Sequence, residues 1–189
     1  HRGAIKSCIE TVKICYEAAL AAGAPEDCIQ IIEHHSREVT HTFMSHPKIA
    51  LILATGGTGL VKAAYSSGNP AVGVGPGNVP VLIDKSADIP YAISSIISSK
   101  TFDNGMICAS EQSIVVEKEI AESIIEELKN QNCYILNQQE TEKVSKVCIV
   151  EETGGMSPHI VGQAATVIAE HAGISVPGDT KILIEIGRA

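Results

Sequence analysis

The chain has 189 residues, of which 44% are hydrophobic and 19% are charged, and its formal net charge is −8. These proportions are typical of a globular protein. The acidic balance and the absence of any Lys/Arg cluster argue against general nucleic-acid binding, which needs a basic surface. No apolar run is long enough to span a membrane, so we expect no membrane partner.

The six cysteines include no C-x-x-C pair and no Cys/His pairing at zinc-finger spacing. Because no secretory signal precedes them, we expect free thiols in a reducing cytoplasm. The sequence starts at His1 without Met and ends in an apolar run. We therefore expect a piece of a longer protein.

Apolar residues recur at helical spacing over residues 4–22, which predicts a helix with one apolar face. Gly23 and Pro25 follow in the order typical of a helix end. A short apolar run at residues 29–32 predicts a strand. Ser36 is a favourable N-cap for a second helix that ends before Pro47.

Residues 49–54 form a continuous apolar run, which predicts a fully buried parallel strand. A turn with sequence Thr-Gly-Gly-Thr-Gly begins at Thr55, and a helix is predicted over residues 60–66. A strand, a glycine turn and a helix together direct backbone N–H groups and a positive dipole end at an anion. Two interpretations stay open, a phosphate-binding turn and a tight turn whose glycines serve only geometry.

Residues 71–78 alternate glycine with other residues, at Gly73, Gly75 and Gly77, around Pro76. Such a segment permits close contact with a ligand, or it acts as a hinge between domains. Beyond it, strands are predicted at 79–83, 113–116, 134–136 and 181–186, and helices, the first capped by Asp88, at 90–99, 119–130, 140–147 and 160–172, with a loop at 152–157. This alternation predicts an α/β fold with largely parallel pairing.

A polar, glycine-containing loop at residues 100–112 carries Cys108. Reactive side chains commonly lie on loops held by rigid elements, and a thiol acts as a nucleophile when it is ionised. Free cysteine is also among the most buried residue types, so a structural role is the alternative. The loop by itself leaves both interpretations open.

Residues 54–67, 73–78 and 100–112 together resemble the CoA-acylating branch of the aldehyde dehydrogenase superfamily, and most closely the aldehyde dehydrogenase half of bacterial bifunctional acetaldehyde/alcohol dehydrogenases. Residues 160–163 and 180–184 extend the likeness. The resemblance implies an aldehyde dehydrogenase-like fold. It makes residues 1–78 the C-terminal part of a Rossmann-like NAD-binding domain and residues 79–189 the N-terminal part of the catalytic domain. The early part of the cofactor domain, with an asparagine of the oxyanion hole, and the end of the catalytic domain would then lie outside this chain.

The resemblance also implies the reaction. Cys108 attacks a short-chain aldehyde, acetaldehyde being the expected one, hydride passes to NAD, and coenzyme A takes the acyl group from the resulting thioester. The reverse reaction reduces an acyl-CoA with NADH. The implied cofactor contacts are Thr55, Gly56, Gly57 and Gly75.

Gly73 separates this branch from hydrolytic relatives, whose Glu-Leu-Gly-Gly motif has at this position a glutamate that activates water. Glycine accepts no proton, and a missing general base slows a reaction by about 10²–10⁴-fold. The resemblance therefore favours acyl transfer to coenzyme A. Glu111 is an alternative base, although a structural role is expected for it. The other functions considered are a hydrolytic aldehyde dehydrogenase and a nucleotide-binding module without catalysis.

Further expectations concern partners. His34, His35 and His41 lack the spacing of a metal site, so none is predicted. The resemblance implies a homo-oligomer at full length, a cytoplasmic or microcompartment location, and for the bifunctional type a fused iron-dependent alcohol dehydrogenase domain. The isolated 189 residues are expected to show no turnover, because half of the NAD site would be missing.

Overall fold

The computed structural model describes residues 4–187 and divides into two compact units, His1–Pro76 and Gly77–Ala189, called here the first and second unit. The division lies close to the predicted domain boundary after residue 78. The assignment of the two parts to an NAD-binding and a catalytic domain stays a prediction. None of the helices in the described residues is long and apolar enough to cross a membrane.

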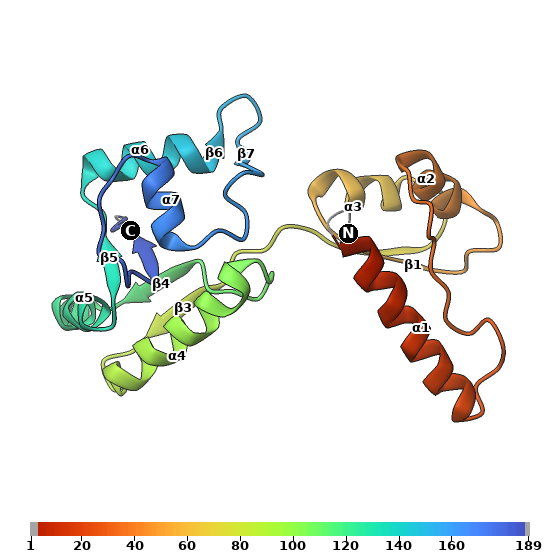
Figure 1. Ribbon diagram of the computed structural model, residues 1–189, viewed down its shortest axis with the longest axis horizontal. Coiled ribbons are helices and arrows are strands. Elements are labelled where there is room, and N and C mark those ends of the chain that lie inside the picture. The colour runs from red at the N-terminus through yellow and green to blue at the C-terminus, as the bar shows by residue number, and fades with distance from the viewer. Residues whose placement is uncertain (1–3, 188–189) are drawn as a thin grey trace. The chain divides into compact units, whose positions relative to one another are not determined.

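The first unit is built on two short parallel strands that run side by side (Figure 1). Ile52 pairs with Ala71 at one end of the ladder and Thr55 with Val74 at the other. Met44, Ala54 and Ala64 form its small buried core. The elements in order are α1 (Ile5–Ala21), α2 (Arg37–Ser45), β1 (Ile52–Thr55), α3 (Thr58–Tyr65) and β2 (Ala71–Val74).

Local sequence accounts for the helix ends of this unit. The predicted helix over residues 4–22 is confirmed as α1, and Gly23 follows it with φ of +90°. Ser36 caps α2, because its Oγ accepts a hydrogen bond from the backbone N–H of Val39 at 3.0 Å. The strand predicted at residues 29–32 is wrong. No strand pairs with this segment in the described residues, and Ile29 and Ile32 are exposed.

The second unit contains two parallel strand pairs and one antiparallel pair. The parallel pairs are β3 (Pro80–Ile83) with β4 (Ser113–Val116), and β5 (Cys133–Ile135) with β8 (Ile182–Ile184). The antiparallel pair, β6 (Ile149–Val150) with β7 (Gly155–Met156), contains part of the segment predicted as a loop. The helices are α4 (Ile89–Thr101), η2 (Phe102–Gly105), η3 (Lys118–Ile120), α5 (Ala121–Asn130), α6 (Gln138–Cys148) and α7 (Ala165–His171).

A core of aliphatic side chains joins α4 and α5 to the strands of the second unit. Ile93 is fully buried, and the rest of the cluster comprises Ile83, Ile96, Ile97, Ile124, Leu128 and Cys133. Asp88 starts α4 by accepting a hydrogen bond from the Tyr91 N–H at 3.1 Å. Helices alternate with mostly parallel strands in both units, so the predicted α/β class is confirmed.

The helix predicted over residues 160–172 is wrong in its first part. Helix α7 begins only at Ala165, and Gly162 has φ of +76°, which a right-handed helix does not accommodate. The N–H of Gln163 donates to the carbonyl of Ile160 at 3.1 Å, so residues 160–163 form a turn. This turn lies against the loop that carries Cys108, because Nδ2 of Asn104 donates to the Gly162 carbonyl.

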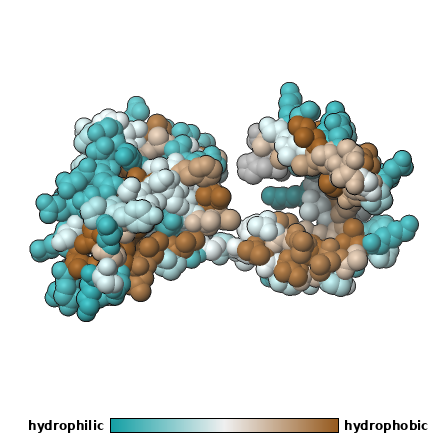
Figure 2. Space-filling view, turned by 90° about the horizontal axis from the view of Figure 1, so that it is seen from below, coloured by the Kyte–Doolittle hydropathy of each residue, from teal (hydrophilic) through white to brown (hydrophobic). Residues whose placement is uncertain are grey.

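Apolar side chains are exposed on both units (Figure 2). In the first unit they include Leu53, Val72 and Val74 on one face of the β1–β2 pair. In the second unit Leu82 and Val115, which are register partners, share the exposed face of β3 and β4.

Candidate nucleophile loop and glycine turn

Cys108 lies on an exposed loop whose two ends are anchored in the second unit. Before the loop, α4 ends at Thr101, whose Oγ1 donates to the Ile97 carbonyl at 2.7 Å. After the loop, the N–H of Gln112 donates to the Val79 carbonyl at 3.0 Å, which ties the loop to the start of β3. Cys108 is an exposed, free thiol, so it is not a buried structural cysteine.

A tight turn presents the thiol. The N–H of Ser110 donates to the carbonyl of Ile107 at 3.0 Å, which places Cys108 and Ala109 at the two corners of a β-turn. Ser110 is only 2% exposed, so the chain turns back into the protein directly after the exposed thiol. The turn therefore holds Cys108 accessible on a short, hydrogen-bonded segment. Its role as nucleophile stays a prediction.

The three consecutive residues 103–105, which precede this turn, have left-handed backbone conformations. Asp103, Asn104 and Gly105 have φ of +51°, +48° and +72°. Asp, Asn and Gly are the residue types that tolerate this region best, and that composition is the signal that sequence reasoning missed. The side chain of Asn104 extends to the turn at residues 160–163, where its Nδ2 donates to the Gly162 carbonyl at 2.9 Å.

Two glycines are packed closely around the same loop. A Cβ at Gly162 would lie 2.8 Å from Sδ of Met106, so the Met106 side chain rests on the Gly162 backbone. A Cβ at Gly105 would lie 3.4 Å from both Cε and Nζ of Lys100. Both glycines have positive φ, so a side chain at either position would meet backbone strain as well as a neighbour.

Two buried polar atoms follow Cys108. Oγ of Ser110 and Oε2 of Glu111 have no hydrogen-bond partner within residues 4–187. A buried carboxylate oxygen without a donor is unfavourable, because it has lost its hydrogen bonds to water and no protein donor replaces them. One oxygen of Glu111 is therefore turned into the protein, and its role as a base or as a structural residue stays a prediction.

The glycine turn of the first unit connects β1 to the N-terminus of α3, and its role in binding an anion stays a prediction. Strand β1 ends at Thr55 and α3 begins at Thr58, with Gly57 as an N-cap that offers no side-chain cap. The N–H of Gly56 donates to the Val74 carbonyl at 3.0 Å, so the turn is fixed to β2. A Cβ at Gly57 or at Gly75 would meet nothing within 4 Å. Uncapped N–H groups beside this open space suit a phosphate-bearing ligand.

Gly73 is enclosed by α3. Its N–H donates to the Tyr65 hydroxyl at 2.9 Å. A Cβ at this position would lie 2.5 Å from Cγ1 of Val61 and 2.9 Å from Cε2 of Tyr65. Residues 71–78, expected to be a ligand-contacting segment or a hinge, thus include strand β2. Gly73, the first glycine of this segment, allows α3 to pack closely against the strand. A glutamate at position 73 would have to displace both side chains.

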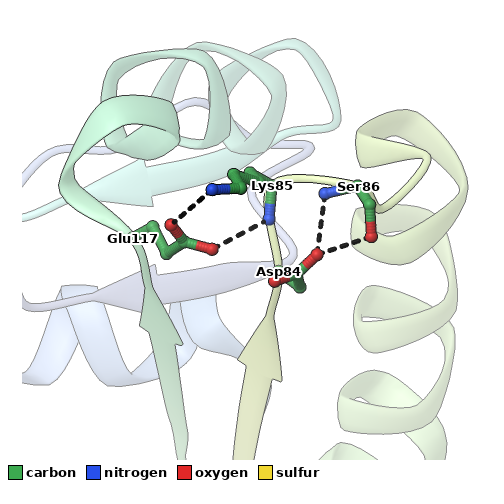
Figure 3. Close-up of polar contacts among 4 residues, drawn as sticks. All are labelled: Asp84, Lys85, Ser86 and Glu117. Carbon is green, nitrogen blue, oxygen red and sulfur yellow. Dashed lines mark hydrogen bonds and ion pairs between the residues drawn. The ribbon is translucent and has the colours of Figure 1, made fainter.

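A polar cluster joins the carboxyl ends of β3 and β4, which are parallel and paired (Figure 3). Asp84 Oδ1 accepts hydrogen bonds from the hydroxyl and the N–H of Ser86, and these bonds lower the pKa of the Asp84 carboxyl. The Lys85 N–H donates to Glu117 Oε1 at 3.3 Å, and Lys85 Nζ lies 3.9 Å from Glu117 Oε2. The nucleophile loop leads into the start of β4, so this cluster lies at the other end of the strand pair from the loop.

The described part of the chain contains no group of three or more His, Cys, Asp or Glu side chains that could hold a metal ion. Two of the remaining cysteines are shielded from solvent. Burial raises the pKa of the Cys133 thiol to about 11, and burial also raises the pKa of Cys148. Neither thiol is as accessible as Cys108.

Comparisons with known proteins give one consistent result. Residues 5–144 match the aldehyde dehydrogenase family. The chain is 53% identical over 171 residues to the bifunctional aldehyde-alcohol dehydrogenase AdhE of Escherichia coli K12, and the match covers 90% of this chain and 19% of that protein. The structure of an acetylating aldehyde dehydrogenase from Geobacillus thermoglucosidasius matches with a TM-score of 0.92 and 49% identity, over 100% of this chain and 41% of that one.

A third match is a Rhodopseudomonas palustris propionaldehyde dehydrogenase solved with bound CoA and an acylated cysteine. Its TM-score is 0.79 and its identity 33%, over 90% of this chain and 39% of that one. The expected aldehyde dehydrogenase-like fold is confirmed by these matches. The present chain nevertheless spans only about a fifth of the E. coli protein and about two fifths of the matched structures.

Proposed function

The chain belongs to the aldehyde dehydrogenase family, and on this premise we propose that the protein carrying it is an NAD-dependent, CoA-acylating aldehyde dehydrogenase. It oxidises a short-chain aldehyde, acetaldehyde in the first instance, to the acyl-CoA, and it catalyses the reverse reduction. The names of the E. coli and Geobacillus relatives support this activity. The observation that carries the proposal is the exposed Cys108 thiol on an anchored loop.

Cys108 is the nucleophile in this proposal. Its thiolate adds to the aldehyde carbonyl and forms a thiohemiacetal, and loss of hydride from that carbon leaves a thioester on Cys108. The thiolate of coenzyme A then attacks the thioester carbonyl, and the Cys108 thiolate leaves. The relative solved with CoA and an acylated cysteine supports a covalent intermediate of this kind.

The backbone at Cys108 has a second role. Its N–H is proposed to donate to the oxygen that gains negative charge when the thiolate adds. The turn from Ile107 to Ser110 restricts the direction of that N–H. Removing one such donor typically costs roughly 3–4 kcal/mol of transition-state stabilisation.

The glycine turn is the proposed cofactor site. Thr55, Gly56, Gly57 and Gly75 would hold the dinucleotide, with the open Gly57 and Gly75 allowing its close approach. When bound, the nicotinamide accepts the hydride. The chain itself supplies N–H groups and space, because the start of α3 carries no acidic side chain and no side-chain cap.

Gly73 supports transfer to coenzyme A over hydrolysis. No side chain at this position can take a proton from water, and Val61 and Tyr65 fill the space around its Cα. A thiol is a better intrinsic nucleophile than water and depends less on a general base. We therefore propose that the thioester persists until coenzyme A reaches it.

Omission of coenzyme A tests the proposed function directly. The native-length protein with acetaldehyde, NAD⁺ and CoA should form NADH steadily, and without CoA it should stop after about one turnover per site. Steady NADH formation at the same rate without CoA would show a hydrolytic enzyme and overturn the proposal.

A fused alcohol dehydrogenase domain is a separate proposal, supported by the E. coli relative and tested by ethanol-dependent NADH formation in the same preparation.

A further inference from the structure

The left-handed segment at residues 103–105 needs a physical cause. A left-handed conformation costs an L-residue roughly 1–2 kcal/mol, and such residues normally occur singly. Asp103 and Asn104, with φ/ψ of +51°/+32° and +48°/+37°, stand in succession before Gly105. Such strain persists where surrounding contacts fix the backbone. The side chains of Asn104 and Met106 make such contacts.

Asn104 provides the connection. Its Nδ2 donates to the Gly162 carbonyl at 2.9 Å, across 58 positions of sequence. The acceptor lies on a turn that is itself well supported. Ile160 and Ser157 are 6% and 9% exposed, and the N–H of Ile160 donates to the Ser157 carbonyl. The amide side chain of Asn104 therefore fastens the nucleophile loop to the turn at residues 160–163 through an exposed hydrogen bond, and this turn begins at the buried Ile160.

Met106 adds a second contact between the same two segments. Its thioether rests on Gly162, at a distance that leaves no room for a Cβ there. The N–H of Met106 donates to the Asp103 carbonyl at 3.1 Å, which closes the left-handed turn. The β-turn that carries Cys108 begins at the next residue. The direction in which the chain enters that turn is thus set by residues 103–106.

We propose that Asn104 is a positioning residue, which holds the Cys108 thiol and its backbone N–H in place through the hydrogen bond to the Gly162 carbonyl. The inference rests on the proposed function, because a fixed nucleophile matters only if Cys108 reacts. Asn104 itself touches no reacting atom in this account. A nucleophile loop released from its anchor samples orientations in which the thiol is misplaced, and misplacement of about 1 Å can cost around 10²-fold in rate.

Three substitutions at position 104 separate the hydrogen bond from the backbone conformation. N104G accepts positive φ without strain but lacks the amide. N104D also tolerates positive φ, but it turns a carboxylate without a proton toward the Gly162 carbonyl. N104A lacks the amide and resists the conformation. If the hydrogen bond positions Cys108, all three should lower kcat in the native-length protein, roughly ten- to a hundredfold, with KM for NAD⁺ unchanged.

Asn132 offers a matched control. It is also an asparagine with positive φ, +68°, but no side-chain hydrogen bond is found for it in the described residues. N132G should therefore leave kcat as in the wild type. Rates are divided by the folded fraction measured by circular dichroism, so that a smaller folded fraction does not imitate a slower enzyme.

Wild-type kcat in N104G and N104D, with loss only in N104A, would show that backbone conformation alone matters and would overturn the proposal. The substitution G162A disrupts the same contact at the residue whose carbonyl accepts the hydrogen bond. The double variant N104G/G162A should be little worse than the poorer single variant, because both changes break one connection. Fully additive losses would contradict a shared connection.

Hydrogen exchange keeps this inference separate from the proposed function. In N104G the backbone amides of residues 103–110 should exchange faster, while those of β5 and β8 should not change. If the wild type forms no NADH with CoA, the proposed function fails, and exchange alone still decides whether Asn104 holds the loop. Unchanged exchange at residues 103–110 would overturn the positioning role.

Discussion

Two glycines of the first unit and two glycines around the nucleophile loop of the second unit serve opposite purposes, although Gly56 and Gly73 in the first unit are closely packed as well. In the first unit, Gly57 in the glycine turn and Gly75 directly after β2 have open space where a side chain would be. Around the nucleophile loop of the second unit, Gly105 and Gly162 are in close contact with Lys100 and Met106 and have positive φ. Open glycines leave room for a ligand, whereas packed glycines hold a loop in one conformation.

Removal of the Cys108 thiol should have the largest effect on activity. It should leave the proposed cofactor site in the first unit unaffected. C108A should lower CoA-dependent NADH formation by about 10⁴-fold or more, because the covalent route needs the nucleophile. The affinity for NAD⁺ should stay unchanged, as measured by fluorescence titration. C15A is the control, since Cys15 is also an exposed, free thiol. Equal activity in C108A and C15A would remove Cys108 from the mechanism.

The variant G73E introduces the glutamate that hydrolytic relatives have at this position. It tests whether the space around position 73 accommodates that side chain. G73E should destabilise the protein by about 1–3 kcal/mol, because its Cβ would lie 2.5 Å from Val61 Cγ1. Urea unfolding followed by circular dichroism measures the loss. A stable G73E protein that forms NADH steadily without CoA would show that the space around position 73 opens easily.

Alanine at an open and at a packed glycine should give opposite results. G57A should leave stability unchanged, because φ at Gly57 is −65° and no atom lies near the added Cβ, but it should raise Kd for NAD⁺ severalfold. G105A should cost about 1 kcal/mol of stability, because φ there is +72°. Thermal unfolding and NAD⁺ titration of both variants test the contrast. An unchanged Kd in G57A would argue against ligand contact at the turn.

Cys133 should produce an effect that is absent at neutral pH, a pH dependence of stability at the alkaline end. Burial raises the pKa of this thiol from 9.0 to about 11 in the folded protein. The folded state therefore holds the proton more tightly than the unfolded state, and this contribution is complete below about pH 9. It should be lost as pH rises from 9 toward about 11. Urea unfolding across this range should show the decline, and C133A should flatten it.

Much of the fold could be predicted from local pattern. The alternation of helices and strands, the caps at Ser36 and Asp88 and the strand at residues 113–116 depend on nearby residues, and all are confirmed. The strand at residues 29–32 failed because pairing is not local. The helix predicted from residue 160 failed because its apolar spacing hid Gly162, whose positive φ ends any right-handed helix.

The candidate site could be predicted only in part for the same reason. The loop position of Cys108 followed from its polar, glycine-containing surroundings, and its exposure agrees with that interpretation. The contact from Asn104 to Gly162 spans 58 positions, and no periodicity reports such a pair. The Asp-Asn-Gly composition at residues 103–105 was the available signal. It indicates tolerance of left-handed backbone but does not reveal the partner.

Peptide mass spectrometry after a single turnover detects the proposed acyl intermediate on Cys108. The native-length protein is mixed with acetaldehyde and NAD⁺ in the absence of coenzyme A, quenched in acid and digested. We expect one acetyl group on the peptide that contains Cys108, and its disappearance when coenzyme A is added before the quench. An unmodified Cys108 in a preparation that has formed NADH, or an acetyl group on another cysteine, would contradict the account.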